Sequence, residues 1–101
     1  MIIYNITTKV HSSIDQQWLG WQQEIFIPAM MATGFFSSHR FLRLLDQDDS
    51  EGNTYAVQYT VDNQEQYNQF MLQQATALRG MAAAAWGERV ISFHSALEVI
   101  Q

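Results

Sequence analysis

Four stretches of the chain alternate between apolar and polar residues with the period of two that is typical of β-strands. The first, residues 2–10, is rich in β-branched and aromatic side chains, which strands favour. The other three cover residues 35–46, 53–62 and 89–100, and polar or glycine-containing segments separate them from their neighbours. The pattern therefore predicts four strands.

Residues 13–32 instead place apolar side chains at spacings of three and four, the pattern of an amphipathic helix. Ser13, followed three residues later by Gln16, has the form of a capping box and predicts the start of the helix. Pro28 lacks an N–H and its ring clashes with the preceding turn, so we expect a kink or break near residues 26–28.

A second helical period covers residues 63–85. Asp62 or Asn63 can accept a hydrogen bond from a free N–H of its first turn, and Gly87 predicts where it ends. The resulting order, βαββαβ, predicts a ferredoxin-like α+β fold, in which two helices cover one face of a four-stranded antiparallel sheet. At 101 residues, we expect one domain over residues 1–101.

The stretches 35–46 and 54–61 are apolar on both faces, which predicts that they are central or near-central strands. Two helices cover one face of such a sheet, so the other face needs a partner. We therefore predict a homodimer that buries the helix-free face against a second copy, with small residues allowing close approach. In residues 35–46, one face carries Phe35, Phe41 and Leu45 and the other Phe36, Leu42 and Leu44, and the small residues are Thr54, Ala56, Ser92 and Ala96.

The composition narrows the classes of partner. A formal net charge of −5 disfavours nucleic acid, because acidic proteins repel phosphate backbones. The longest apolar runs are far shorter than a membrane span, and no signal segment is apparent, so we expect a soluble protein without membrane contact. The chain has no cysteine, which fits a reducing compartment, and we expect a cytoplasmic location.

Candidate binding residues gather on the second predicted strand. His39 and Arg43 lie on one face with Phe41 between them, so an imidazole and a guanidinium can converge on an anionic ligand beside an aromatic wall. The same residues are also typical of a sheet edge with solvated cations. The other candidates are Arg40 on the second strand, Tyr55 and Tyr59 on the third, and His94 and Glu98 on the fourth.

Trp18 and Trp21 stand one helical turn apart and, with several methionines, favour either an ordinary core or a cleft for a flat apolar molecule. We expect no metal, because His11, His39 and His94 lack ligand spacing. No phosphate-binding glycine loop and no catalytic triad is recognisable, so we expect no cofactor and no nucleotide-dependent chemistry.

With these elements in place, the chain resembles a small bacterial family of about one hundred residues whose function is unknown. The resemblance covers the whole chain and implies no chemistry. It rests on IIYN, the WxxW at Trp18 and Trp21, IPAMMATGFF, RLL at Arg43 to Leu45, TYAVQY and WGER.

The predicted fold is also similar to that of the dimeric α/β-barrel superfamily. Its members pair two sheets face to face and include cofactor-independent oxygenases, isomerases, haem-degrading enzymes and ligand-sensing modules. Because a fold does not fix a function, three hypotheses stay open. The first is binding or sensing of a small apolar or aromatic ligand between helices and sheet, the second a cofactor-independent oxygenase or isomerase, and the third a structural or assembly role.

Overall fold

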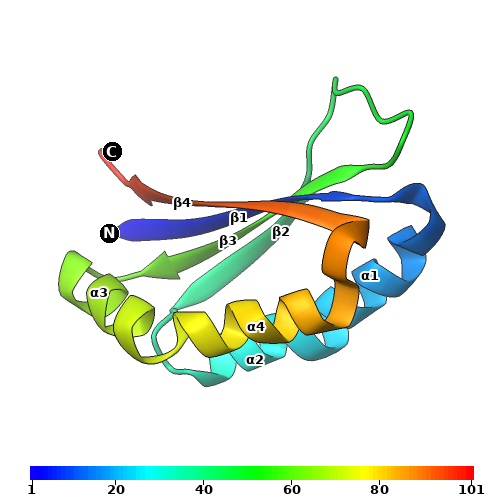
Figure 1. Cartoon of the computed structure of the whole chain (residues 1–101). Coiled ribbons are helices and arrows are strands. Elements are labelled where there is room, and N and C mark those ends of the chain that lie inside the picture. The colour runs from blue at the N-terminus through cyan, green and yellow to red at the C-terminus, as the bar shows by residue number, and fades with distance from the viewer.

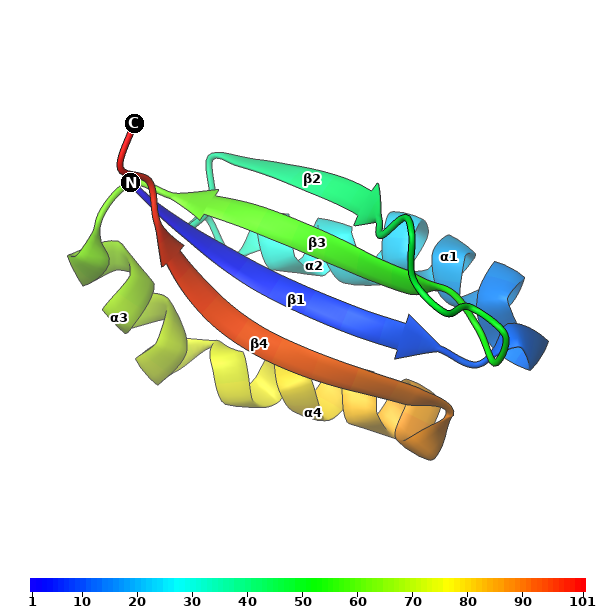
Figure 2. The ribbon, with the colours of Figure 1, turned by 90° about the horizontal axis from the view of Figure 1, so that it is seen from above.

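The computed structural model describes residues 1–101 and contains one antiparallel sheet in the order β2-β3-β1-β4. The ferredoxin-like prediction is thereby confirmed, with β1 and β3 in the centre and β2 and β4 at the edges (Figure 2). The strands are β1 (Ile2–Val10), β2 (Ser38–Arg43), β3 (Thr54–Val61) and β4 (Val90–Glu98).

All helices lie on one face of this sheet (Figure 1). α4 runs along β4, whereas α1 and α2 lie behind β2 and β3 (Figure 2). The helices are α1 (Asp15–Trp21), α2 (Ile27–Ala32), α3 (Gln64–Gln73) and α4 (Ala75–Trp86), with a π-helical turn (Gln22–Phe26) and two 3₁₀ turns (Ser12–Ile14 and Gly87–Arg89). No helix is long and apolar enough to cross a membrane.

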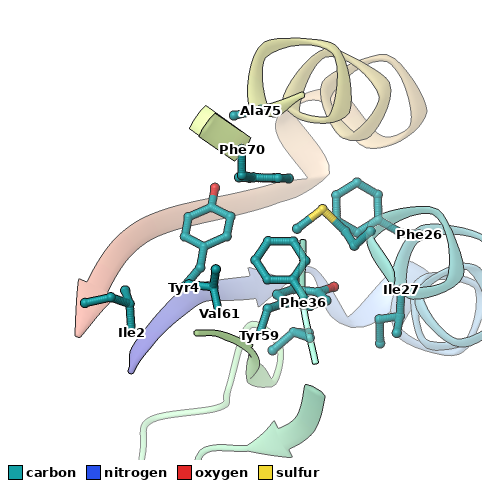
Figure 3. Packing of buried hydrophobic residues seen from close by; sticks show 11 residues of the cluster. Ile2, Tyr4, Phe26, Ile27, Phe36, Tyr59, Val61, Phe70 and Ala75 are labelled. Atoms are coloured by element: carbon teal, nitrogen blue, oxygen red, sulfur yellow. The ribbon is translucent and has the colours of Figure 1, made fainter. Parts of the chain in front are cut away.

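The core lies between the sheet and the helices. Tyr4 and Tyr59 are opposite each other on β1 and β3, and both pack against Phe36 (Figure 3). Phe70 of α3 covers Tyr4 and Phe36 from the helix layer. A second, smaller cluster lies nearer the start of α1 and consists of Val10, Ile14, Trp18 and Tyr55.

The prediction for residues 35–46 was wrong in two respects. β2 is shorter, Ser38–Arg43, and it is an edge strand, since only β3 pairs with it. Phe35 and Phe36 come before the strand and both pack into the helix-side core. Burying two adjacent phenylalanines on one side outweighs strand alternation, which would have sent one of them to the opposite face.

The assignment of small residues to the helix-free face was also partly wrong. Ser92 and Ala96 pair with Thr8 and Tyr4, whose side chains face the helices. In an antiparallel sheet, residues directly opposite each other share a face, so Ser92 and Ala96 lie on the helix side. The helix-free face of β4 instead carries Ile91, Phe93 and Leu97.

The helix ends differ in detail from the sequence prediction. His11, not Ser13, caps the first turn, because its Nδ1 accepts from Ser13 N–H. The predicted kink at residues 26–28 is a π-helical turn at Gln22–Phe26, in which Ile27 N–H reaches Gln22 O. The wider turn accommodates Pro28 in the helix, although proline cannot donate a backbone hydrogen bond.

The second helical stretch is broken at Gln74 into α3 and α4. The predicted cap at its start is confirmed, because Asn63 Oδ1 accepts from Gln66 N–H at 2.9 Å. The predicted end is confirmed as well: Gly87 follows α4 with φ at 56°, a conformation that favours glycine.

Candidate functional site

A cavity of about 250 Å³ lies between the sheet and the helix layer, bounded by β1, β4, α1, the π-helical turn and α4. Its size is near the lower end of ligand pockets, about 300 Å³, so it suits a molecule of one or two rings. Thirteen of its nineteen lining residues are hydrophobic, and the walls are therefore mainly apolar.

Aromatic rings form one wall of the cavity. Trp21 is half-buried, stacks on Phe26 with 5.0 Å between ring centroids, and meets Trp86 edge-on at 5.8 Å. Small side chains of α4 leave the space open on the other side. These are Ala75, Ala82 and Ala83.

Tyr4, His94 and Arg79 form a hydrogen-bonded group at the cavity's mouth, where the His94 and Arg79 side chains are exposed. The Tyr4 hydroxyl lies 2.6 Å from His94 Nδ1 and accepts from Arg79 Nη2 at 3.1 Å and Nε at 3.4 Å. Since the hydroxyl has one proton to give, we assign it as the donor to Nδ1. Neutral His94 then carries its own proton on Nε2.

The electrostatics support this assignment. Burial, and secondly the Arg79 charge, lower the pKa of His94, so its imidazole is neutral at pH 7. Burial raises the pKa of Tyr4, and the Arg79 hydrogen bond and charge oppose this rise only in part. Arg79 is the one charged residue in a lining that contains no carboxylate.

Two buried polar atoms in the lining have no hydrogen-bond partner: Gln22 Oε1 and Trp86 Nε1. The Gln22 side chain is only 6% exposed, which is unusual for a glutamine. Gln22 opens the π-helical turn, and such turns occur frequently at functional sites. An unpaired buried polar atom costs about 1–3 kcal/mol, so both atoms lower the stability of the folded protein.

The structure brings three of the candidate residues to the cavity, Trp18, Trp21 and His94. Tyr59 is fully buried in the core beside Phe36 and does not line the cavity, and its hydroxyl has no partner. Burial raises its pKa far above the usual range for tyrosine. Its contact with a ligand stays a prediction.

The cationic candidates of β2 lie at the opposite edge of the sheet from the cavity. Arg43 borders a shallow hollow with Phe41 and Tyr55. His39 is opposite Tyr59 on the same face of the sheet, and Arg40 is opposite Gln58 on the helix-free face. The three side chains therefore do not surround one site, and their contact with a ligand stays a prediction.

Sequence reasoning missed Tyr4, Arg79 and Gln22, and it considered His94 only together with Glu98 or as a metal ligand. One signal was present, because Arg79 is the only cation between Gln64 and Trp86 and interrupts an apolar period. The pairing of Tyr4 with His94 needs the strand order β1-β4, which the sequence pattern predicts only through the fold. No group of three or more histidine or acidic side chains is placed to hold a metal ion.

Solved structures with similar folds cover nearly the whole chain. A protein of the ethyl tert-butyl ether D family from Bacillus halodurans has a TM-score of 0.71 at 14% identity, covering 98% of this chain and 100% of its own. SnoaB, a cofactor-independent oxygenase from Streptomyces nogalater, has a TM-score of 0.68 at 14% identity, covering 99% and 94%. A dimeric ferredoxin-like protein from an uncultured marine organism has a TM-score of 0.68 at 11% identity, and the match covers 99% of this chain and 95% of that protein.

Identities this low establish similarity of fold alone. No curated protein shows significant sequence similarity to the chain. A family model covers almost its full length, residues 1–100. The chain therefore belongs to the family described as "Domain of unknown function (DUF4286)".

Proposed function

We propose that this protein binds a small apolar, mainly aromatic molecule in the cavity between the sheet and the helices. The observation that carries the proposal is the cavity itself, which combines mainly apolar walls with a few polar side chains, among them Arg79 and His94 at its mouth. Ligand pockets generally combine such walls with a few polar groups that orient the ligand. Trp21 and Trp86 supply flat surfaces for a ring.

A thermal-shift titration with naphthamide, a neutral two-ring probe, tests this proposal, because a ligand of the folded state raises the melting temperature. Ala82→Leu fills the cavity and is expected to abolish the shift. Ala84→Leu is the matched control, since Ala84 is on the same helix but exposed and outside the lining. Equal shifts of the melting temperature in the two variants would mean that the probe binds outside the cavity. Native mass spectrometry of the purified protein would reveal a ligand that is retained from the cell.

A second candidate function is a cofactor-independent oxygenase, as SnoaB is described. The observation in its favour is the short contact between Tyr4 and His94 at the cavity's mouth, next to Arg79. In such a reaction, an electron-rich aromatic substrate supplies the electrons and O₂ accepts them. The Tyr4 hydroxyl donates to Nδ1 of His94, so it can take the substrate proton while it passes its own proton to the imidazole.

Oxygen consumption by the protein with phenolic two-ring compounds tests the enzymatic candidate. A turnover that falls about 100-fold in His94→Gln would support it, since one acid–base group typically contributes that factor or more. His39→Gln is the control at the opposite sheet edge and should leave turnover unchanged. Recovery of every compound unchanged after aerobic incubation would leave binding as the function.

The protein is also proposed to be a homodimer that joins helix-free sheet faces. This face exposes large apolar side chains on β4 that monomers seldom leave in water: Ile91 is 57% exposed, Phe93 66% and Leu97 45%. The solved dimeric ferredoxin-like protein has a similar fold. The cytoplasm stays the proposed location, because a chain without cysteine fits a reducing compartment.

Sedimentation at micromolar concentration tests the dimer. The wild type should sediment at twice 11.6 kDa, and Phe93→Lys should shift the protein toward the monomer by placing a charge in the apolar face. A wild type that sediments as an 11.6 kDa monomer would disprove the dimer without affecting the cavity.

A further inference from the structure

We propose that the ligand of the cavity is an anion: a small aromatic acid whose carboxylate binds Arg79 and His94 while its ring lies against Trp21 and Trp86. This inference rests on the proposed binding function and adds the chemical class of the ligand. It follows from the charges and the free hydrogen-bond donors at the cavity's mouth.

The charge of the lining is positive and uncompensated. Arg79 is its only charged residue, and none of the lining residues is an aspartate or glutamate. The hydrogen bonds of Arg79 go to the neutral hydroxyl of Tyr4. An arginine side chain commonly pairs with a carboxylate. Because the lining has none, the carboxylate that pairs with Arg79 would come from the ligand.

The groups that remain free at this end are donors. The two hydrogen bonds to Tyr4 use Nε and Nη2 of Arg79, so the Nη1 protons are not engaged with Tyr4. With Nδ1 of His94 facing the Tyr4 hydroxyl, Nε2–H is its remaining polar group. A planar carboxylate has two oxygens that can accept from two such donors, whereas a ligand cation would meet only repulsion.

Tyr4 positions both donors. Its ring is fixed in the core, with Phe70 at 5.6 Å and Phe36 at 6.4 Å between centroids (Figure 3). Its hydroxyl holds the exposed Arg79 and His94 side chains next to each other, which lowers the entropy lost when a ligand binds.

The test compares naphthoate with naphthamide, which have nearly the same shape and differ in charge. Calorimetric titration of the full-length wild type should show naphthoate binding at least about tenfold more tightly, because charged hydrogen bonds exceed neutral ones. Raising the salt concentration should weaken the binding of naphthoate and leave the binding of naphthamide unchanged.

Arg79→Gln should reduce naphthoate affinity about 10- to 100-fold and change naphthamide affinity less than about threefold. Arg79→Lys should retain part of the preference for naphthoate over naphthamide, since lysine keeps the positive charge but lacks the planar guanidinium group. Arg43→Gln is the matched control: it removes the same charge at the opposite sheet edge and should preserve the preference. Circular dichroism verifies that each variant is folded.

Three outcomes would overturn the inference, and they differ in what else they imply. Equal binding of the two probes by the wild type would disprove the anion preference and leave the binding function standing. A preference that survives in Arg79→Gln but disappears in Arg43→Gln would place the anion at β2. No binding of either probe would remove the binding function and the anion preference together. The wild-type comparison needs no variant, so a folding defect in Arg79→Gln does not prevent the test.

Discussion

The two edges of the sheet carry nearly the same functional groups and differ in the space around them. At the β2 edge, His39 and Arg43 are opposite Tyr59 and Tyr55. At the β4 edge, His94 and Arg79 bond to Tyr4. The enclosed cavity lies beside the second set, whereas the first set borders only a shallow hollow, so residue type alone does not define a site.

The size of the helix side chains explains this difference. On the β2 side, Trp18 of α1 fills the space above the sheet, stacked on Tyr55 at 5.2 Å and edge-on to Phe41 at 5.8 Å. On the β4 side, α4 presents alanines such as Ala82, which leave a cavity between helix and strand. The polar groups of β2 therefore flank a filled core, and those of β4 flank an opening.

The largest expected effect comes from removing the ring that fills the closed side. Trp18 is 2% exposed, and Trp18→Ala should lower the free energy of unfolding by about 3–5 kcal/mol. Trp21 is half-buried against the cavity, so Trp21→Ala should cost about half as much. Urea unfolding at equal protein concentrations measures both, and an equal cost would mean that the two sides are equally packed.

The same comparison predicts opposite responses to added volume. Val57 lies 3% exposed in the filled core, so Val57→Ile should destabilise the protein by about 1–3 kcal/mol. Ala82→Leu adds more atoms, yet it enters the cavity and should cost less than about 0.5 kcal/mol or stabilise the fold. Melting temperatures of the two variants test this prediction. A larger loss of stability in Ala82→Leu than in Val57→Ile would contradict an open cavity.

The fold could be predicted from the sequence because periodicity is a local property. Residues 2–10 coincide with β1, and the Asn63 cap and Gly87 end are where the pattern places them. The βαββαβ order of elements predicted the fold, but not that the second strand lies at an edge of the sheet. The failures at Phe35 and Phe36 arise because tertiary burial outweighs alternation where a strand begins.

The site could be predicted only in part. Trp18 and Trp21 were found because aromatic residues at helical spacing are visible along the chain. The group around Tyr4 was not, since its members are 75 and 90 residues apart and meet only once β1, β4 and α4 are assembled. A cavity is also a property of side-chain volume in three dimensions, which a one-dimensional pattern does not carry.

Two tyrosines on β3 are expected to differ by a smaller amount in what their hydroxyl groups contribute to stability. Tyr55 donates to Asp15 at 2.8 Å, so Tyr55→Phe should cost about 1 kcal/mol. The Tyr59 hydroxyl is buried without a partner, so Tyr59→Phe should be neutral or stabilise the protein by about 1 kcal/mol. Denaturant unfolding measures both. A loss of ligand binding in Tyr59→Phe would instead show that its hydroxyl reaches the ligand.

The smallest expected effect is the pH dependence that His94 contributes. Its folded pKa lies below the ordinary value of 6.5, so the unfolded chain binds the proton more readily. Stability should therefore fall as the pH drops through 6.5 and level off below the lowered pKa. Tyr4 and Arg79 face the ring, and the pKa of the Tyr4 hydroxyl is raised above 10.0, far from this range. His94→Gln should reduce this acid-side loss, and an unchanged profile would contradict the lowered pKa of His94.

The most direct test of an open, ligand-binding side is a two-dimensional ¹H–¹⁵N NMR titration of the protein with naphthoate. The chain has three tryptophans, so three indole N–H signals report on the cavity from known positions. We predict saturable shifts of the Trp86 and Trp21 indoles and of amides in β4 and α4, with β2 amides unchanged. Shifts confined to residues 38–43, or none that saturate, would contradict the assignment of the site to the β4 side.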